Sequence, residues 1–223
     1  SIESIHAYSL IHDDLPCMDD DDFRRGKLST HKKFNEATAI LAGDAMHDFA
    51  FDLISSKLRN IEPNINLKLL NYLSICNGYT GLAGGQSLDL IYENKKSNKK
   101  QIIDMYKMKT GKLFEFSFAA PFIVTNSTTK RINFAKKYGS LFGLVFQIID
   151  DLLDEINNFE KLGKTPGKDK KQGKRTLHSL LGKNNVIFYC EKIIEQFIKK
   201  NKSEFLKNII LEKLLKFNLQ RLK

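Results

Sequence analysis

The chain has 223 residues, of which 42% are hydrophobic and 28% charged, so it can bury the core of one large domain or two small ones. This composition excludes a disordered or collagen-like chain, and 4 Pro and 13 Gly are too few for a turn-rich all-β protein. The net charge of +10 suits nucleic acid, an anionic membrane surface or a phosphorylated small molecule equally well, so charge alone selects none of them.

Cysteine usage and hydropathy place the chain in a reducing, cytoplasmic environment. Cys17, Cys76 and Cys190 are far apart and form no CxxC pair, which predicts neither a disulfide framework nor a zinc site. The longest uncharged run, residues 71–88, is interrupted by glycines and polar groups, and it therefore predicts no membrane span. The chain opens at Ser1 without an initiator Met and already in helical periodicity, so we expect a segment to precede it.

Apolar residues recur at three- and four-residue spacing along most of the chain, which is typical of helices with one buried face. This spacing predicts helices over residues 36–58, 65–82, 101–122, 130–153 and 185–220. The breaks between them fall at Pro63, 94–100, 126–127 and 163–174. None of these breaks is long enough for a linker, so residues 1–223 are predicted to form a single all-α domain, a helical bundle.

An acidic cluster occupies residues 13–22, where six of ten residues are Asp. Carboxylates at this density repel one another, so the cluster is either a solvated turn or is neutralised by a cation. Asp13 and Asp19 are six residues apart and would not share one face of a helix. Pro16 lets the helix unwind between them, and we expect this unwinding to bring the two carboxylates together.

A second acidic cluster favours the cation. Residues 139–154 are apolar on almost every side until their acidic end, which predicts a helix buried in the middle of the bundle. Asp150 and Asp154 are four residues apart and share one helix face, where hydration is poor. Carboxylates from two helices are suitable ligands for Mg²⁺ that bridges substrate phosphates.

Basic residues stand where an anion bound to that metal would need them. Arg24 and Arg25 follow the first acidic cluster, and Lys109 lies in the segment KMKTGK. Lys164 and Lys174 lie on a glycine-rich stretch that could close over phosphates. Any one of these lysines alone would be interpreted as a solvated surface residue, but together with two carboxylate clusters they predict a diphosphate site.

The ordered motifs resemble those of the trans-isoprenyl diphosphate synthases, and within that family the bacterial type of farnesyl diphosphate synthase. The segments that carry the resemblance are SLIHDDLPCMDDDDFRRG at 9–26, LAGDA at 41–45, GGQSLDL at 84–90, KTGKLFEFS at 109–117, FQIIDDLLD at 146–154 and the terminal FNLQRLK. Family members carry an upstream helical segment that helps to hold isopentenyl diphosphate. Nothing here precedes Ser1, so we expect a chain that lacks this N-terminal segment and is either a fragment or impaired toward that substrate.

The resemblance implies an all-α bundle around a central cavity and a Mg²⁺-dependent condensation of dimethylallyl or geranyl diphosphate with isopentenyl diphosphate. The metal ligands it implies are Asp13, Asp19, Asp150 and Asp154, with Asp14 as an outer partner. The residues it implies for the allylic diphosphate are Arg24, Lys109, Thr110, Gln147, Lys164 and Lys174. Of these, Lys109, Thr110 and Gln147 would be catalytic because their oxygen dipoles face the allylic cation. Isopentenyl diphosphate would be held by His6, two turns before Asp13, and by Arg25 and Arg221.

Product length follows from the residues just before the first acidic cluster. Tyr8 lies five residues before Asp13, about 7.5 Å deeper along a helix at 1.5 Å rise per residue. The bacterial farnesyl synthases pair an aromatic at this position with two extra residues in the first Asp motif, as this chain does. The resemblance therefore implies a C15 product, with Tyr8 and Ser9 limiting its length. The alternative is that Tyr8 packs sideways into the bundle.

Other functions stay open. The chain is also compatible with a geranylgeranyl or longer-chain polyprenyl diphosphate synthase, and the missing front is compatible with a non-catalytic partner subunit. A terpene cyclase would be expected to replace the second motif with an Asn/Ser/Glu triad, whereas DDLLD is intact. A basic nucleic-acid binder is disfavoured because six Asp would repel the phosphate backbone. A homodimer is implied by the family resemblance alone.

Overall fold

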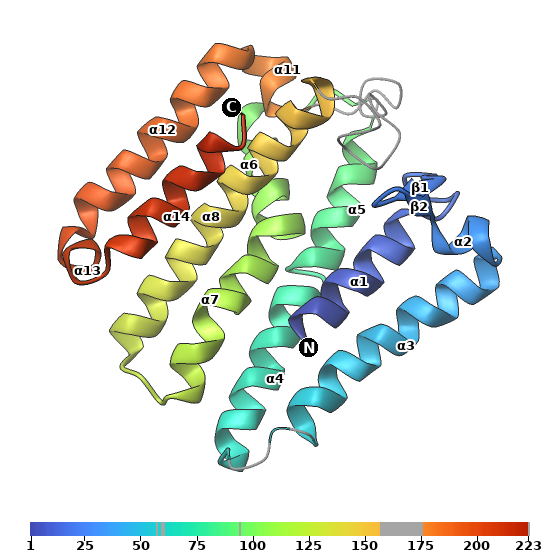
Figure 1. Ribbon diagram of the computed structural model, residues 1–223, viewed down its shortest axis with the longest axis horizontal. Helices are drawn as coiled ribbons and strands as arrows, with labels where there is room; N and C mark the ends of the chain where they lie inside the picture. Colours follow the sequence, from blue (N-terminus) through green and yellow to red (C-terminus); the bar gives the residue numbers. More distant parts are fainter. Residues whose placement is uncertain (57, 59–60, 94, 157–175, 223) are drawn as a thin grey trace.

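The computed structural model describes residues 1–56, 58, 61–93, 95–156 and 176–222. The fold is all-α, as predicted: long helices lie side by side, and the two strands form only a short antiparallel hairpin (Figure 1). None of the described helices is long and apolar enough to cross a membrane.

The helices and strands follow one another as a bundle with the hairpin inserted after the first helix. Their bounds are α1 Ile2–Asp13, β1 Phe23–Arg24, β2 Lys27–Leu28, α2 Thr30–Lys33, α3 Glu36–Ser55, α4 Pro63–Asn77, α5 Leu82–Tyr92, α6 Lys99–Tyr106, the π-helical η1 Lys107–Gly111, α7 Lys112–Val124, α8 Thr129–Ile156, α11 Leu177–Leu181, α12 Lys183–Lys200, α13 Lys202–Lys207 and α14 Ile209–Gln220.

Several predicted breaks coincide with helix ends, for physical reasons. Pro63 is the first residue of α4, where its missing N–H and fixed φ are tolerated. Asn126 adopts a left-handed φ of 48° between α7 and α8, which asparagine tolerates better than most residues. Asn98 caps α6 in a reciprocal capping box with Gln101, so the predicted break over 94–100 ends at a helix start.

Two of the predicted helices are subdivided. The range 65–82 contains the end of α4 and the start of α5, separated by a turn in which a Cβ on Gly81 would lie 2.0 Å from the backbone oxygen of Cys76. Only glycine fits there. The range 185–220 contains three helices, and Asn201 and Asn208 stand at the two breaks between them.

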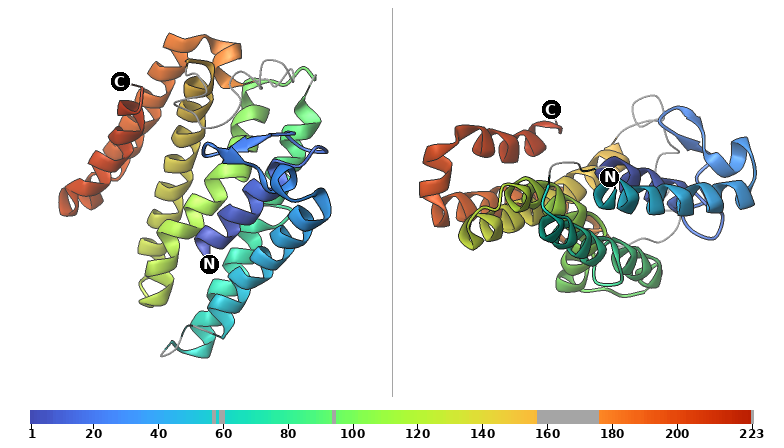
Figure 2. Two further views of the ribbon diagram at one scale, coloured as in Figure 1. Left: turned by 45° about the vertical axis from the view of Figure 1, so that its right-hand side comes forward. Right: turned by 90° about the horizontal axis from the view of Figure 1, so that it is seen from below.

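The core has two apolar clusters. One surrounds α8, and the fully buried residues that α8 contributes to it include Val145, Ile148, Ile149 and Leu152. The other joins α1, α3, α4 and α7, and it includes Ile5, Ala50, Leu73 and Ala119. Figures 1 and 2 show that α12–α14 and α1–α3 lie on opposite sides of α7 and α8. The acidic end of α8 lies at the end of the bundle that α11 also occupies (Figure 1).

Candidate active site

A cavity of about 330 Å³ lies between α1, α5, the η1–α7 segment and α8. Its polar lining includes Asp13, Gln86, Lys109, Thr110, Gln147 and Asp150. Its apolar lining includes Leu10, Leu82, Leu113, Phe114 and Phe146. Glu3, His6, Ser9 and Ser117 complete its polar lining. Residues from both Asp-rich motifs therefore face one space whose wall is apolar along Leu10, Leu82, Leu113, Phe114 and Phe146.

The first acidic cluster is folded back on the end of α1. The helix ends at Asp13, three residues before Pro16, and the backbone N–H of Asp19 donates to the carbonyl of Asp13 at 2.8 Å. Asp20 has a left-handed φ of 49° in this turn. The turn brings the backbones of Asp13 and Asp19 together, and both carboxylates act electrostatically on the same ammonium group, that of Lys109.

Lys109 is a buried cation between carboxylates. Its Nζ donates to Asp89 Oδ2 at 2.6 Å. Burial alone would lower the pKa of the Lys109 ammonium, but Asp89, Asp13 and Asp19 raise this pKa above its ordinary value. Lys109 is therefore charged over the whole physiological pH range and remains a fixed positive charge in the cavity.

The π-helical turn η1 aims Lys109 and Thr110 at the cavity. A Cβ on Gly85 would lie 2.1 Å from the backbone nitrogen of Lys109, so only glycine lets α5 pack this closely on the turn. Single π-helical turns are rare in proteins as a whole, but many of those that occur lie at functional sites. Such a turn redirects the side chains of the helix that contains it. Gly85 of the GGQSLDL motif thus sets the distance between α5 and η1, whereas a Cβ on Gly84 would lie 1.8 Å from the carbonyl oxygen of Tyr79.

A hydrogen-bond chain fixes Gln147. Thr110 Oγ1 donates to Gln147 Oε1, and Gln147 Nε2 donates to Asp151 Oδ1 at 2.7 Å. Tyr106 OH donates to the other oxygen of Asp151 and accepts from the backbone N–H of Leu177 at 3.1 Å. Burial and the Asp151 charge raise the pKa of Tyr106 well above its ordinary value, so the phenol stays protonated and can donate. Asp151 thereby orients Gln147.

Asp150 and Asp154 occupy different environments although both are on α8. Asp150 lines the cavity and accepts from Arg221 Nη2 at 2.9 Å. The Arg221 guanidinium also stacks 4.2 Å from the centre of the Phe146 ring. Asp154 is buried, with 7% of its surface exposed, and is not among the residues that line the cavity. The structure therefore places Arg221 at the second Asp cluster.

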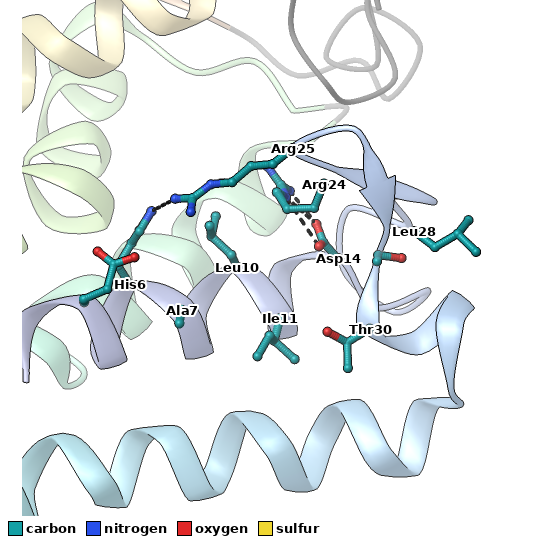
Figure 3. A pocket seen from close by; sticks show the side chains of 11 residues that line it. His6, Ala7, Leu10, Ile11, Asp14, Arg24, Arg25, Leu28 and Thr30 are labelled. Carbon is teal, nitrogen blue, oxygen red and sulfur yellow. Dashed lines mark hydrogen bonds and ion pairs between the residues drawn. The ribbon is translucent and has the colours of Figure 1, made fainter.

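A second cavity of about 180 Å³ lies between α1 and the β1–β2 hairpin. Figure 3 shows Arg25 reaching from the hairpin toward His6, and the two side chains are 3.4 Å apart at Nη2 and Nε2. Arg25 has a φ of 53° and Gly26 a φ of 75°, so the hairpin turn is left-handed at both positions. Burial lowers the pKa of the His6 imidazole below its ordinary value, so the ring is neutral near pH 7.

The two cavities share a wall. Glu3, His6 and Leu10, on one face of α1, line both of them. The two cavities are therefore neighbours along the same face of α1.

Arg24 lies in the second cavity and not in the first, which holds Lys109 and Thr110. Its guanidinium donates to Asp14 through both Nε and Nη2 (Figure 3). Its Nη2 also lies 3.4 Å from Asp21 Oδ2. Asp14 is 2% exposed, so this ion pair fastens the hairpin to the end of α1.

Tyr8 and Ser9 point to different surroundings. Ser9 lines the 330 Å³ cavity, called the large cavity below, whereas Tyr8 is not among the residues that line it. The Tyr8 ring packs edge-on against His12 and His47, and its hydroxyl donates to Asn77 Oδ1 at 2.5 Å. This is the sideways packing that the sequence left as the alternative. Tyr8 still belongs to the apolar cluster that contains the cavity-lining Leu82 and Leu113.

Sequence reasoning missed three residues that hold this site together: Asp89, Tyr106 and Asp151. The role of Asp89 could have been predicted from the sequence, because Asp89 lies in the GGQSLDL motif and a carboxylate in such a buried segment needs a cation such as Lys109 as its partner. Tyr106 carries no sequence signal, since its role depends on a contact 45 residues along the chain. Lys164 and Lys174 lie outside the described residues.

The residues around the large cavity fit a hard divalent cation. Asp13 and Asp150 supply carboxylates from α1 and α8, and Asp19 is held beside Asp13 by the returning turn. An all-oxygen donor set is what Mg²⁺ prefers. The three carboxylates do not converge within ligand distance of one another: among the described residues, the group of three whose ligand atoms lie within 4.8 Å of one another is Asp20, Asp22 and His31. In that group Asp22 already pairs with Lys32 at 3.0 Å.

The fold and the site together define an all-α bundle with acidic and basic side chains gathered around one cavity. The family model described as polyprenyl synthetase matches residues 1–212. The chain belongs to the polyprenyl synthetase family.

Several curated relatives are named farnesyl diphosphate synthase. The chain is 46% identical over 182 residues to the farnesyl diphosphate synthase of Micrococcus luteus, covering 82% of this chain and 62% of the relative. It is 36% identical over 226 residues to that of Escherichia coli K12, covering 99% of this chain and 76% of the relative. The chain thus spans less than two thirds of the Micrococcus relative's length.

Solved structures share the fold. A geranyltransferase from Helicobacter pylori, crystallised with magnesium and isoprenyl diphosphate, superposes with a TM-score of 0.87 at 32% identity, covering 99% of this chain and 72% of that one. A geranyltranstransferase from Thermotoga maritima gives a TM-score of 0.75 at 35% identity, covering 99% of this chain and 72% of that one.

The Asp89–Lys109 pair gives a prediction about stability. Asp89→Asn leaves the buried Lys109 ammonium without its nearest countercharge, so the free energy of unfolding in urea should fall by about 3 kcal/mol. The double variant Asp89→Asn/Lys109→Met, which removes both charges, should recover most of this loss. Equal losses in the single and double variants would show that the pair is not coupled.

Proposed function

We propose that this protein is a Mg²⁺-dependent prenyltransferase that condenses an allylic diphosphate with isopentenyl diphosphate to give farnesyl diphosphate. One observation carries the proposal: Asp13 and Asp150, from the two Asp-rich motifs, line a single apolar-walled cavity together with Lys109. The names of the relatives and the magnesium and isoprenyl diphosphate of the Helicobacter structure support it. The product distinguishes this function from that of longer-chain synthases.

The large cavity would hold the allylic substrate with its diphosphate at the acidic end. Asp13, Asp19 and Asp150 would bind Mg²⁺, with Asp154 behind them, and the bound ion supplies Lewis-acid neutralisation of the leaving diphosphate. Lys109 adds a charge that Asp89 keeps in place. The apolar walls take up the hydrocarbon tail and exclude water, which would otherwise capture a cation.

The reaction then needs few side-chain movements. The carbon–oxygen bond of the allylic diphosphate breaks, and both electrons leave with the diphosphate. The double bond of isopentenyl diphosphate attacks the allylic carbon, and a proton passes to the departed diphosphate. Thr110 and Gln147 would face the cation with oxygens that are held by their own hydrogen bonds and are too weakly nucleophilic to trap it.

The small cavity would hold the isopentenyl diphosphate. Arg25 supplies a guanidinium, and neutral His6 supplies an N–H without adding charge. Arg24 lies in this cavity too, so we assign it to the isopentenyl side, where it braces the hairpin through Asp14. Arg221, at Asp150, would act on the diphosphates from the acidic end of the large cavity.

Two further features of the proposal concern assembly and location. We propose a homodimer, and the exposed apolar side chains Leu41 and Phe49 on α3 and Leu67 on α4 support a partner on that face. We also propose a cytoplasmic protein, in keeping with its three free cysteines.

Asp150→Asn in the complete polypeptide tests the proposed function. Loss of one metal carboxylate should lower turnover at saturating Mg²⁺ by about 10²-fold or more, while the far-UV circular dichroism stays unchanged. Glu155→Gln is the matched control, because Glu155 lies on the same helix, is exposed and pairs with His178 outside the cavity. Near-normal turnover in Asp150→Asn would contradict the two-cluster site.

Arg25→Ala tests the division between the two cavities. Removing this guanidinium should raise the KM for isopentenyl diphosphate by about tenfold or more, because a charge-assisted hydrogen bond is lost. The KM for the allylic substrate should stay within about twofold. Lys27→Ala, on the exposed strand of the same hairpin, should change neither constant. An equal rise in both KM values would refute the assignment.

Tyr8→Ala tests product length. Tyr8 packs against the apolar cluster that also contains the cavity-lining Leu82 and Leu113, so truncation of its ring should loosen that side of the cavity and shift the product from C15 to C20 or longer. Tyr8→Phe, which loses only the hydrogen bond to Asn77, should keep C15. Chromatography of the dephosphorylated products decides between these results, and C15 from Tyr8→Ala would mean that other residues set the length.

A further inference from the structure

Gln86, on α5, is a buried carboxamide that has no hydrogen-bond partner in the described part of the chain. The residue is 7% exposed and lines the large cavity. Neither its Oε1 nor its Nε2 has a hydrogen-bond partner among the described residues. Leaving such a group unsatisfied costs about 1–3 kcal/mol, and buried polar atoms in native proteins are nearly always paired. A ligand in the cavity is the natural partner.

The neighbouring polar groups are already committed to one another. Of the two carboxamides that line the cavity, Gln147 has both ends engaged, by Thr110 and by Asp151. Lys109 is engaged by Asp89. Gln86 therefore differs from the residues around it in having its whole dipole available to whatever occupies the cavity.

Gln86 lies on α5 between the apolar wall of the cavity and its polar end. Leu82, one turn earlier, is part of the apolar wall, and Asp89, one turn later, binds Lys109 at the polar end. Gly85 fixes this placement, because it packs directly on the backbone of Lys109. In a substrate with its tail on Leu82 and its diphosphate near Lys109, the bond between hydrocarbon and phosphate oxygen lies level with Gln86.

We propose that Gln86 is a catalytic residue whose carboxamide oxygen faces the allyl carbons and stabilises the positive charge that develops as the carbon–oxygen bond breaks. This role rests on the proposed function. Both electrons of the broken bond leave with the diphosphate, and Gln86 forms no bond and transfers no proton. An oriented dipole in an apolar cavity, where the effective dielectric constant is low, stabilises such charge far better than water does.

The Gln86 carboxamide has no hydrogen-bond partner among the described residues, and this suits a group that stabilises a transient cation. No hydrogen bond holds either end of the Gln86 amide, so the group can turn its oxygen toward a cation, and an amide oxygen is a poor nucleophile that does not capture it. The interaction is weak with the neutral allyl unit of the substrate and strong with the cation. Such a group accelerates ionisation without tightening substrate binding.

Steady-state kinetics of Gln86→Met in the complete polypeptide, with geranyl diphosphate and isopentenyl diphosphate, test the role. Methionine keeps the length of the side chain and removes the dipole. We expect kcat to fall by about 10-fold to 100-fold, with both KM values within about twofold of the unmodified protein. The melting temperature should not fall, because the substitution removes an unsatisfied buried amide.

Two further variants complete the test. Gln86→Leu removes the same dipole with a different shape and should show the same fall in kcat. Ser117→Ala is the matched control: Ser117 lines the cavity, but its hydroxyl already donates to the carbonyl of Leu113 at 2.8 Å, so kcat should stay within about twofold.

The outcomes separate this role from the proposed function. If the unmodified polypeptide forms no prenyl product, the proposed function fails and the role of Gln86 fails with it. If the unmodified polypeptide is active and Gln86→Met keeps its kcat, the role alone is overturned. A raised KM for geranyl diphosphate at unchanged kcat, or a lowered melting temperature that accounts for the lost activity, also overturns it in favour of ground-state binding or a structural contact.

Discussion

Repulsion between carboxylates is the constraint on which the rest of the structure depends. Asp13 at the end of α1 and Asp150 near the end of α8 line one cavity with a largely apolar wall, and the Asp150 side chain is 41% exposed at its mouth, so their like charges must be offset by solvent or by cations. Among the described residues, Lys109 and Arg221 bring positive charge to these carboxylates. The helices hold the carboxylates in place regardless, because α8 is anchored by the apolar cluster around it. A bound cation is the simplest means of balancing this charge.

The supporting contacts keep the polar end of the cavity in a fixed arrangement. The π-helical turn η1 presents Lys109 and Thr110, and α5 holds that turn through the close approach of Gly85 and the Asp89 ion pair. Behind it, Tyr106 and Asp151 orient Gln147. A substrate would therefore meet dipoles and charges that are already aligned, which is how a site stabilises a short-lived cation without reorganising.

The sequence predicts much of this arrangement and misses the parts that depend on distant contacts. Periodicity predicts the all-α fold and the buried course of α8, and Pro16 predicts the turn that returns Asp19 to Asp13. Spacing alone does not show that the ring of Tyr8 turns toward His47, because its direction depends on packing against α3. The same holds for Arg24, which lines the second cavity only because the hairpin folds over α1, and for Tyr106, whose partner lies on another helix.

The most direct test of the two-cluster account is a crystal structure of the complete polypeptide with Mn²⁺ in place of Mg²⁺ and an allylic diphosphate analogue that cannot ionise. Anomalous scattering from Mn²⁺ locates the ions independently of the protein atoms. The account predicts ions in the large cavity, coordinated by oxygens of Asp13 on one side and Asp150 on the other, with the diphosphate between them and Lys109. Mn²⁺ bound only at the exposed Asp20–Asp22 turn, with no ion on Asp150, would contradict it.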